Sequence, residues 1–316
     1  MGFPLGGTAH RAEAGSRFPL RAAGRDRAAV QGGGKGGSMG IQAFGARLRH
    51  RASVLALTTT VLMTGLVGLA QPAQANGQFH IDCGLAKHNK RIDPIVDPGR
   101  RSMHRHDLYG AKSISRHSTY RSMRRGGTAC DSRADKSGYW HPTLIKKGRV
   151  IRPMRISAYY WGGPTSNRVR AFPKNLRIIA GGNTNRQKQA GYNCGEGMPT
   201  SKTPLDCHGE HLKGVVIFPS CWNGKSLGIR GNHRSHMAYP EGGECKGKFP
   251  VTLPKLIIHI RWPITDGRGA HLVSDRHMGM RHGMSLHADF WNVWRQSALQ
   301  QHVDQCINQD RTCSVG

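Results

Sequence analysis

The sequence predicts a single β-rich domain, all-β or α+β in class, that is cross-linked by disulfides and has long loops and a C-terminal helix. Three observations lead to this fold class. Short apolar runs recur at irregular spacing, Gly/Asn/Ser/Pro-rich segments separate them, and all eight Cys follow residue 75. Short strands between turn-rich loops are typical of β-domains, and an even number of Cys in an exported chain is typical of a disulfide framework. We expect one domain over residues 76–316.

The N-terminal part of the chain is expected to lie outside this domain. Residues 1–38 are rich in Gly, Ala and Arg and lack apolar periodicity. This indicates that translation starts at Met39 and not at residue 1, and a disordered N-terminal extension is the alternative. Residues 39–75 resemble a signal peptide, because three Arg precede a long uncharged stretch and small residues offer a cleavage site before Asn76. We therefore expect a secreted protein, and a chain anchored by the uncleaved segment is the alternative.

The charge of the chain is strongly positive. Lys and Arg number 47 against 18 Asp and Glu, which gives a net charge of +29. Nine of the basic and two of the acidic residues precede Asn76, so the expected mature domain keeps +22, together with 16 of the 18 His. Such an excess predicts non-specific adhesion to polyanions but identifies no particular one. The composition excludes a polytopic membrane protein, a collagen-like repeat and a coiled coil.

The expected strands follow a polar, Pro-punctuated segment over residues 76–101. The strand candidates, in chain order, are residues 149–161, 176–180, 214–218 and 255–262. In the last of these, Leu256, Ile258 and Ile260 alternate with other residues and so share one face. Loops are expected between the strands, including residues 162–167 and 181–197, which are rich in turn-forming residues.

A helix is expected over about residues 288–307. Phe290, Trp294, Leu299 and Val303 recur there at helical spacing. Asp289 would then lie in the first helical turn, where a carboxylate interacts favourably with the helix dipole.

The eight Cys are expected to form four disulfides between neighbours in the sequence. The predicted pairs are Cys83–Cys130, Cys194–Cys207, Cys221–Cys245 and Cys306–Cys313. Eight Cys allow 105 pairings, so neighbour pairing is a hypothesis. No Cys-x-x-Cys pair is present, which argues against a zinc ribbon or a thioredoxin-type redox site.

Several segments together carry a resemblance to a known family. They are residues 93–106, which begin Asp-Pro-Ile-Val-Asp-Pro-Gly, residues 128–144, which contain Ser-Gly-Tyr-Trp-His-Pro, and residues 172–181, 218–224, 233–240 and 287–290. In this order they resemble the secreted family of fungal and bacterial proteins described as domain of unknown function nineteen-ninety-six. The resemblance implies a secreted single-domain protein and no particular activity. The chain departs from the family pattern at Phe249-Pro250, where the family has a His-Pro pair, and in a His/Met-rich loop over residues 276–284.

Histidines supply the candidate site. His104 and His106 are two residues apart, so in an extended segment both side chains face one side. With His236 and His287 they could bind one divalent metal, Zn²⁺, Mn²⁺ or Cu²⁺, with Asp289 as a further ligand or as the group that orients one His. A metal-free acid–base or anion site, with His104, His106, His287 and Asp289 as the catalytic residues, is one alternative. Purely structural roles for these side chains are the other.

Other chemistries find less support. Met278, Met280 and Met284 in the His/Met-rich loop are soft donors that suit copper, although a flexible loop explains them equally. Asp93 and Asp97, which are next to Pro, are expected to form turns rather than a hydrolytic carboxylate pair. Nucleophile and phosphate-loop motifs are absent from the sequence, and no nucleotide is expected.

Aromatic residues near strand ends suggest sugar binding. The candidate substrate-binding residues are Tyr139, Trp140 and Trp222, whose rings could stack on a pyranose, and Arg177 and Asn223, which could donate hydrogen bonds. The alternative is that these aromatic residues pack in the core.

The sequence therefore predicts a secreted protein that acts on an extracellular or envelope polymer, an anionic or neutral polysaccharide. It would be either a His-centred, metal-dependent enzyme or a metal-containing binder. The alternative is a non-catalytic protein that binds the cell wall or a polysaccharide, and adhesion to polyanions through charge alone is a third possibility. No transmembrane segment is expected after signal cleavage.

Overall fold

The computed structural model describes residues 76–182, 189–228 and 233–315. The expected N-terminal extension (1–38) and signal peptide (39–75) lie outside these residues. Among the described residues, no helix is long and apolar enough to cross a membrane.

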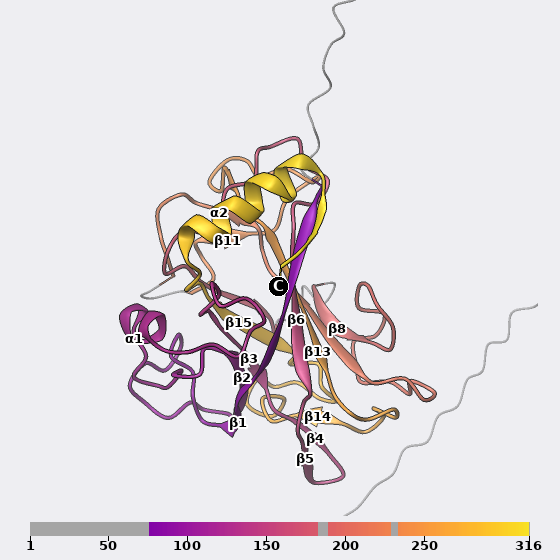
Figure 1. The fold of residues 1–316 in the computed structure, drawn as a ribbon. Helices are drawn as coiled ribbons and strands as arrows, with labels where there is room; N and C mark the ends of the chain where they lie inside the picture. The colour runs from indigo at the N-terminus through magenta and orange to yellow at the C-terminus, as the bar shows by residue number, and fades with distance from the viewer. Residues whose placement is uncertain (1–75, 183–188, 229–232, 316) are drawn as a thin grey trace, which may run out of the picture. The chain divides into compact units, whose positions relative to one another are not determined.

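A ten-stranded sheet forms the centre of the described domain (Figure 1). Its path runs β7 (Arg177–Gly181), β15 (His287–Trp291), β3 (Gly138–Pro142), β2 (His106–Gly110), β1 (Gln78–Lys90), β6 (Arg155–Trp161), β13 (Lys255–Arg261), β9 (Lys213–Ile217) and β8 (Ala190–Asn193). The neighbours along this path are antiparallel, and β16 (Thr312–Ser314) pairs with β1 in parallel. Two three-stranded sheets accompany it: β11 (Met237–Ala238), β10 (Cys221–Trp222) and β12 (Val251–Thr252), and β14 (His271–Leu272), β4 (Leu144–Lys146) and β5 (Arg149–Ile151).

The sheet curls until its two ends approach one another. A Cβ on Gly181, in β7, would lie 3.0 Å from the Cβ of Ala190 in β8 and 2.5 Å from the carbonyl oxygen of Leu286. Gly181 also has a φ of +77°, which side chains with a Cβ rarely adopt. Glycine at this position therefore allows the sheet to close almost completely.

The main core lies inside the curled sheet. Residues that alternate along each strand fill it, such as Phe79 and Ile81 of β1, Tyr139 of β3 and Phe290 of β15, and all are at most 1 % exposed. The β-rich class expected from the sequence is confirmed. Strands were also correctly expected near β7, β9 and β13, whereas the candidate over residues 149–161 is divided into β5 and β6.

The long strand β1 was not expected, because the segment that contains it is polar overall. Its first half alternates between the buried residues Phe79, Ile81 and Cys83 and more exposed ones, whereas its second half is only half-buried. Pairing with β6, β2 and β16 satisfies its backbone polar groups and extends the strand to 13 residues.

A second apolar cluster covers the outer face of β2, β3, β15 and β7. Leu108, Trp140, Trp291 and Ile179 point to this face, opposite to the main core, because their neighbours in each strand point inward. Helix α1 (Tyr120–Arg125) packs on it through Met123, and the segment that follows β1 packs on it through Ile95. The outer face of this half of the sheet is therefore covered by the chain segments on either side of β2, through Ile95, Ile114 and Met123.

The C-terminal helix begins later than expected. Helix α2 (Gln296–Gln305) buries Leu299 and Val303, as the helical spacing predicted. Residues 288–291, which were included in the expected helix, instead belong to β15, which pairs with both β3 and β7. Asp289 is therefore in the middle of a strand and does not belong to a helical turn.

The four expected disulfides are all present. They join Cys83 to Cys130, Cys194 to Cys207, Cys221 to Cys245 and Cys306 to Cys313. The hypothesis of pairing between sequence neighbours is confirmed.

Candidate functional site

Two of the predicted histidines lie at matching positions on the outer face of the sheet. His106 is the first residue of β2 and His287 the first of β15, and β3 runs between these strands. Pro142 of β3 pairs with His106, and the antiparallel pairing of Asp289 with Trp140 places His287 opposite the same Pro142 on the other side of β3. Because neighbouring strands are about 4.8 Å apart, the two imidazole rings can meet above β3.

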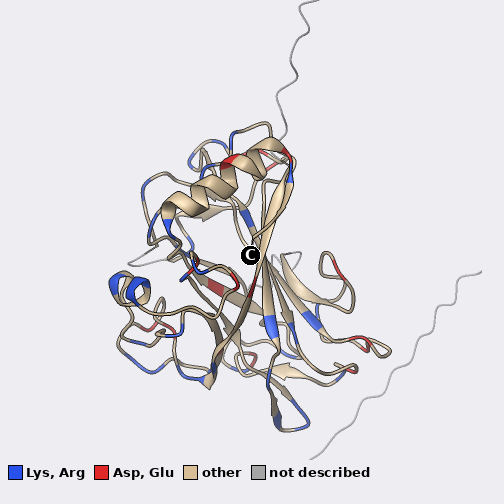
Figure 2. Cartoon of the chain, in the orientation of Figure 1, with Lys and Arg blue, Asp and Glu red and all other residues tan. Residues whose placement is uncertain are grey.

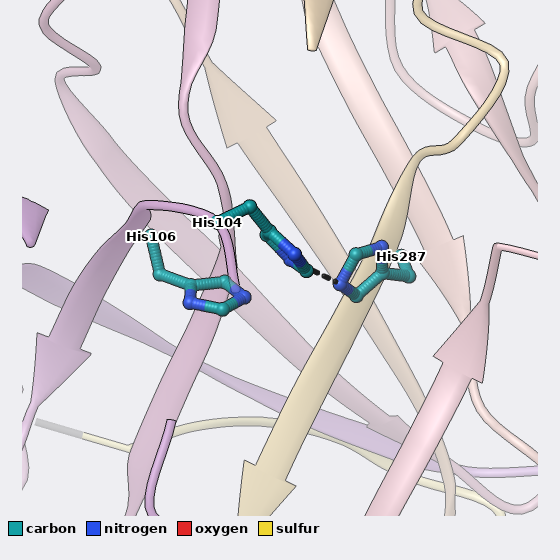
Figure 3. A group of neighbouring side chains, drawn as sticks. All are labelled: His104, His106 and His287. Atoms are coloured by element: carbon teal, nitrogen blue, oxygen red, sulfur yellow. Dashed lines mark hydrogen bonds between the residues drawn. The ribbon is translucent and has the colours of Figure 1, made fainter. Parts of the chain in front are cut away.

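His104 completes a group of three (Figure 3). It lies in the loop just before β2, and its ring centroid is 4.3 Å from that of His106 and 5.2 Å from that of His287. The Nε2 atoms of His104 and His287 are 3.3 Å apart. Two nitrogens that bind one zinc ion at 2.0–2.1 Å in tetrahedral geometry lie about 3.3 Å from each other. The observed distance therefore fits two ligands of one ion.

The ring of His287 is held in the orientation that a metal ligand requires. Its Nδ1 lies 2.8 Å from the carbonyl oxygen of Ser285, to which it donates a hydrogen bond. Its Nε2 is then the unprotonated nitrogen and accepts a hydrogen bond from Nε2–H of His104 (Figure 3). Asp289 was expected to orient one of the histidines, but it forms no hydrogen bond to any of the three rings. A backbone carbonyl does this instead, as is common around metal ligands.

All three rings are held in the neutral form. Burial, reinforced by neighbouring His, lowers the pKa of His104 to about 4 and that of His287 to about 3. Burial also lowers the pKa of His106 well below its ordinary value. A neutral imidazole is the form that binds a metal. Near neutral pH, the three rings therefore do not have to release a proton from a charged form before a metal binds.

Buried polar atoms without hydrogen-bond partners gather at this site. Nδ1 of His104, both ring nitrogens of His106 and both carboxylate oxygens of Asp289 are among them. The carbonyl of Ile92 faces His106 and favours a proton on its ring, but without the geometry of a good hydrogen bond. Buried polar atoms are usually paired, so these atoms are the ones at this site that are available to a ligand.

Asp93, which was expected to form a turn, adds a carboxylate to the site. The turn is confirmed, because Oδ1 of Asp93 accepts hydrogen bonds from the backbone N–H groups of Ile95 and Val96. Its other oxygen lies 4.0 Å from Nε2 of His106. Burial raises the pKa of Asp93 to about 6 and that of Asp289 well above its ordinary value, and the charge of Asp93 reinforces this effect in Asp289.

The group opens into a cavity of about 210 Å³. His104, His287, Asp93, Asp289, Arg234 and His277 are among its lining residues. The ring centroid of His277 is 6.0 Å from that of His104, and Met278 also lines the cavity. A small molecule or one unit of a polymer could thus reach the histidines.

One predicted metal ligand lies elsewhere. His236 is not in either of the His-containing groups whose ligand atoms converge in the described part of the chain. Its Nε2 lies 2.7 Å from the carbonyl oxygen of Arg177, with which it forms a hydrogen bond. The expectation that His236 binds the same ion as His104, His106 and His287 is therefore corrected. A third converging group, Cys83, Cys130 and Asp135, offers no free thiolate because its two Cys form a disulfide.

The predicted sugar-binding aromatics do not form a surface. Tyr139 is 0 % and Trp140 is 1 % exposed, so neither ring is available to stack on a ligand, and both are corrected to core residues. Nε1 of Trp222, which is half-buried, donates a hydrogen bond to the carbonyl of Ser226.

The two predicted hydrogen-bond donors of this set also have structural contacts. The side-chain oxygen of Asn223 accepts hydrogen bonds from two backbone N–H groups of its own turn. The guanidinium of Arg177 lies 3.9 Å from the ring centroid of Trp291. These contacts hold the side chains to the protein and do not bring the five residues into one site.

A family comparison covers this entire region. The model for "Domain of unknown function (DUF1996)" matches residues 93–294. The chain belongs to this family. The DUF1996 segment begins at Asp93 and contains the three histidines and Asp289, and it ends before helix α2. No curated protein and no solved structure gives a significant match.

Proposed function

We propose that this DUF1996 protein is a metal-dependent protein in which His104, His106 and His287 bind one divalent transition-metal ion. The observation that carries the proposal is the convergence of three neutral imidazoles whose ligand atoms all lie within 4.8 Å of one another. Imidazole ligands favour Zn²⁺ and Cu²⁺ among the common ions. Three protein ligands leave one coordination position, as in catalytic rather than structural zinc sites.

The residues around the proposed ion suit an enzyme better than a storage site. A bound divalent ion supplies a Lewis acid beside the cavity. Arg234, Asp93 and Asp289 line the same cavity. The guanidinium would attract an anionic group, and a carboxyl would exchange a proton with a substrate bound there. The reaction class that we propose is hydrolysis or elimination on an extracellular polymer.

We also propose that the protein is secreted and works on envelope material. The signal-like segment before Asn76 and the four disulfides support an oxidising, extracellular location. Figure 2 shows Lys and Arg on α1 and on the β4–β5 hairpin, with few acidic residues near them. This charge would concentrate the protein on anionic polymers.

Metal analysis of the purified, folded protein tests the proposal. We expect bound Zn²⁺ or Cu²⁺ that is lost in His104→Ala and His287→Ala, with the fold preserved by circular dichroism. His271→Ala is the matched control, since His271 is exposed on β14. A folded protein that takes up neither ion after chelation and reloading would contradict the proposal.

A non-catalytic polymer-binding role is the second candidate, and one observation favours it. A hollow of about 620 Å³ on β6 and its neighbours is lined by Tyr159 and Trp161, together with polar side chains such as Asn76 and Gln78. Lys255 lies over the Trp161 ring and His80 stacks on Tyr159, so only part of each aromatic surface is open. If this role is correct, Trp161→Ala should weaken co-sedimentation with insoluble polysaccharide, while His104→Ala should leave it unchanged.

A further inference from the structure

We propose that the outer face of β6, β13 and β9 binds a polysaccharide whose sugars carry carboxylates, and that one of these carboxylates takes the place filled by the side chain of Glu196. The proposal rests on the second candidate function, because it uses the hollow lined by Tyr159 and Trp161, and it is independent of the metal site. It adds to that function the chemical class of the polymer and the residues that recognise its charge.

The alternation of side chains along three strands places aromatic and basic groups on this face. The residues of β6 and β13 that point into the main core have even numbers, so the odd-numbered residues point outward. These include Tyr159 and Trp161 of β6 and His259 and Arg261 of β13. Lys213 of β9 is paired with Arg261 in the sheet and therefore shares the face. Aromatic and basic side chains thus lie on neighbouring strands of one surface.

A single carboxylate, that of Glu196, is held by three side chains of this face. Its Oε1 accepts a hydrogen bond from Nζ of Lys213 and lies 3.7 Å from a guanidinium nitrogen of Arg261. Its Oε2 lies 3.5 Å from Nδ1 of His259. The hydrogen bond from Lys213 lowers the pKa of Glu196, so its carboxyl group is ionised near neutral pH. The three side chains therefore form a binding position for a carboxylate.

The position is built from buried side chains, whereas the carboxylate that fills it is exposed. The side chain of Lys213 is 8 % exposed and that of His259 is 10 % exposed, but that of Glu196 is 65 % exposed. A buried ammonium group without a counter-charge is costly. Lys213 therefore requires a carboxylate at this position, but the carboxylate does not have to come from the protein.

The exchange of one carboxylate for another needs no movement of the backbone. The side-chain amide of Asn193 donates hydrogen bonds of 3.1 Å to the carbonyl oxygens of Gly197 and Met198, which fix the loop that carries Glu196. The exposed side chain of Glu196 can turn into water by rotation about its own bonds. A carboxylate of a bound polymer would then accept the hydrogen bond from Lys213 instead.

The aromatic rings beside this position favour a sugar as the carrier of the carboxylate. The ring centroid of Tyr159 is 4.9 Å from that of His259. Tyr159 and Trp161 are two residues apart on one face, which is about 6.7 Å along the strand. A neutral sugar would use only the aromatic part of this surface, and a small organic acid only the basic part. A uronate unit offers both a ring and a carboxylate.

Isothermal titration calorimetry of the full chain with three soluble polymers tests the proposal. The polymers are polygalacturonate, its methyl-esterified form, which lacks the charge, and dextran sulfate, which is anionic but has no carboxylates. Glu196→Gln should bind polygalacturonate about tenfold more tightly than the native protein, because the internal competitor is lost, and Arg261→Gln about tenfold more weakly. Neither substitution should change binding to the esterified form.

Two control variants make the same changes of charge elsewhere. Glu241→Gln and Arg121→Gln alter exposed residues outside the hollow, and both should bind polygalacturonate as the native protein does. Equal gains in Glu196→Gln and Glu241→Gln would overturn the proposal, because net charge alone would then explain them. A gain of the same size with dextran sulfate would also overturn it, because recognition would not depend on a carboxylate.

Trp161→Ala separates this proposal from the function on which it rests. If Trp161→Ala weakens binding to both forms of the polymer while Glu196→Gln and Arg261→Gln bind as the native protein does, the polymer-binding role stands and the carboxylate position is refuted. If Trp161→Ala binds both forms as the native protein does, the polymer-binding role of the hollow is refuted, and the proposal with it. Circular dichroism of each variant confirms that the fold is preserved.

Discussion

Zinc added to the metal-free protein should raise its unfolding temperature by about 5–10 °C. An ion that binds only the folded state stabilises it by about 2.7 kcal/mol when its free concentration is 100 times the dissociation constant. For a domain of about 240 residues, 1 kcal/mol corresponds to about 2–4 °C. The three imidazoles are already neutral and converge, so little of the binding energy is lost in rearranging or deprotonating them.

His287→Ala should remove this increment. The substitution deletes a ring that is 6 % exposed and the hydrogen bond between Nδ1 and the Ser285 carbonyl. The metal-free variant is therefore expected to lose about 1–3 kcal/mol of stability through the lost contact and the cavity. The decisive quantity is thus the shift caused by zinc in each protein and not the unfolding temperature of the metal-free forms.

Differential scanning fluorimetry with and without Zn²⁺ measures this shift. His236→Ala and His271→Ala should keep the full increment, because neither residue belongs to the converging group. Equal zinc shifts in the native protein and in His287→Ala would refute the reasoning, as would the absence of a shift in the native protein at millimolar zinc.

Three further predictions concern the fold around the site. Burial raises the pKa of Asp135 to about 6. Between about pH 4 and 6 the folded state therefore binds more protons than the unfolded state. The free energy of unfolding should then fall as the pH rises through that window. Asp135→Asn should remove about 3 kcal/mol of that fall, measured by denaturant titration at pH 4 and 7, and an unchanged pH profile would contradict the assigned pKa. Trp140→Ala should cost about 3–5 kcal/mol of stability because the ring is buried, whereas Trp222→Ala should cost clearly less; similar losses in denaturant titrations of the two variants would contradict this. Gly181→Ala should destabilise the protein and weaken metal binding, since its Cβ would lie 2.5 Å from the Leu286 carbonyl oxygen and 2.9 Å from Cα of His287; normal zinc uptake with unchanged stability would contradict the tight closure at this point.

The sequence predicted well those features that depend on short-range patterns. The four disulfides join neighbouring Cys, and β13 shows the apolar residues expected of a central strand. The rings of His104 and His106 lie close together, as expected, but His104 is in a bend before β2 and not in the extended segment on which that expectation was based.

Features that depend on long-range pairing were predicted less well. The separation of His104 and His287 is 183 residues, and only the insertion of β3 between β2 and β15 brings them together. His236 has a spacing typical of metal ligands, but a backbone carbonyl occupies its Nε2. Asp93 was correctly assigned to a turn, yet its free oxygen faces His106, which no local pattern indicates.

Helical and strand patterns were confused at one place in the site. Phe290 and Trp294 follow helical spacing with Leu299, but Phe290 faces the main core from a strand. Pairing on both sides with β3 and β7 outweighs local propensity there. As a result Asp289 was expected at a helix end, whereas it is buried in the middle of strand β15.

The most direct test of the central claim is an anomalous difference map at the zinc absorption edge from crystals of the zinc-loaded protein. The account predicts a peak within about 2.0–2.1 Å of Nε2 of His104 and Nε2 of His287, with a nitrogen of His106 as the third ligand. A map without a peak between these three rings, in crystals that contain zinc, would contradict it.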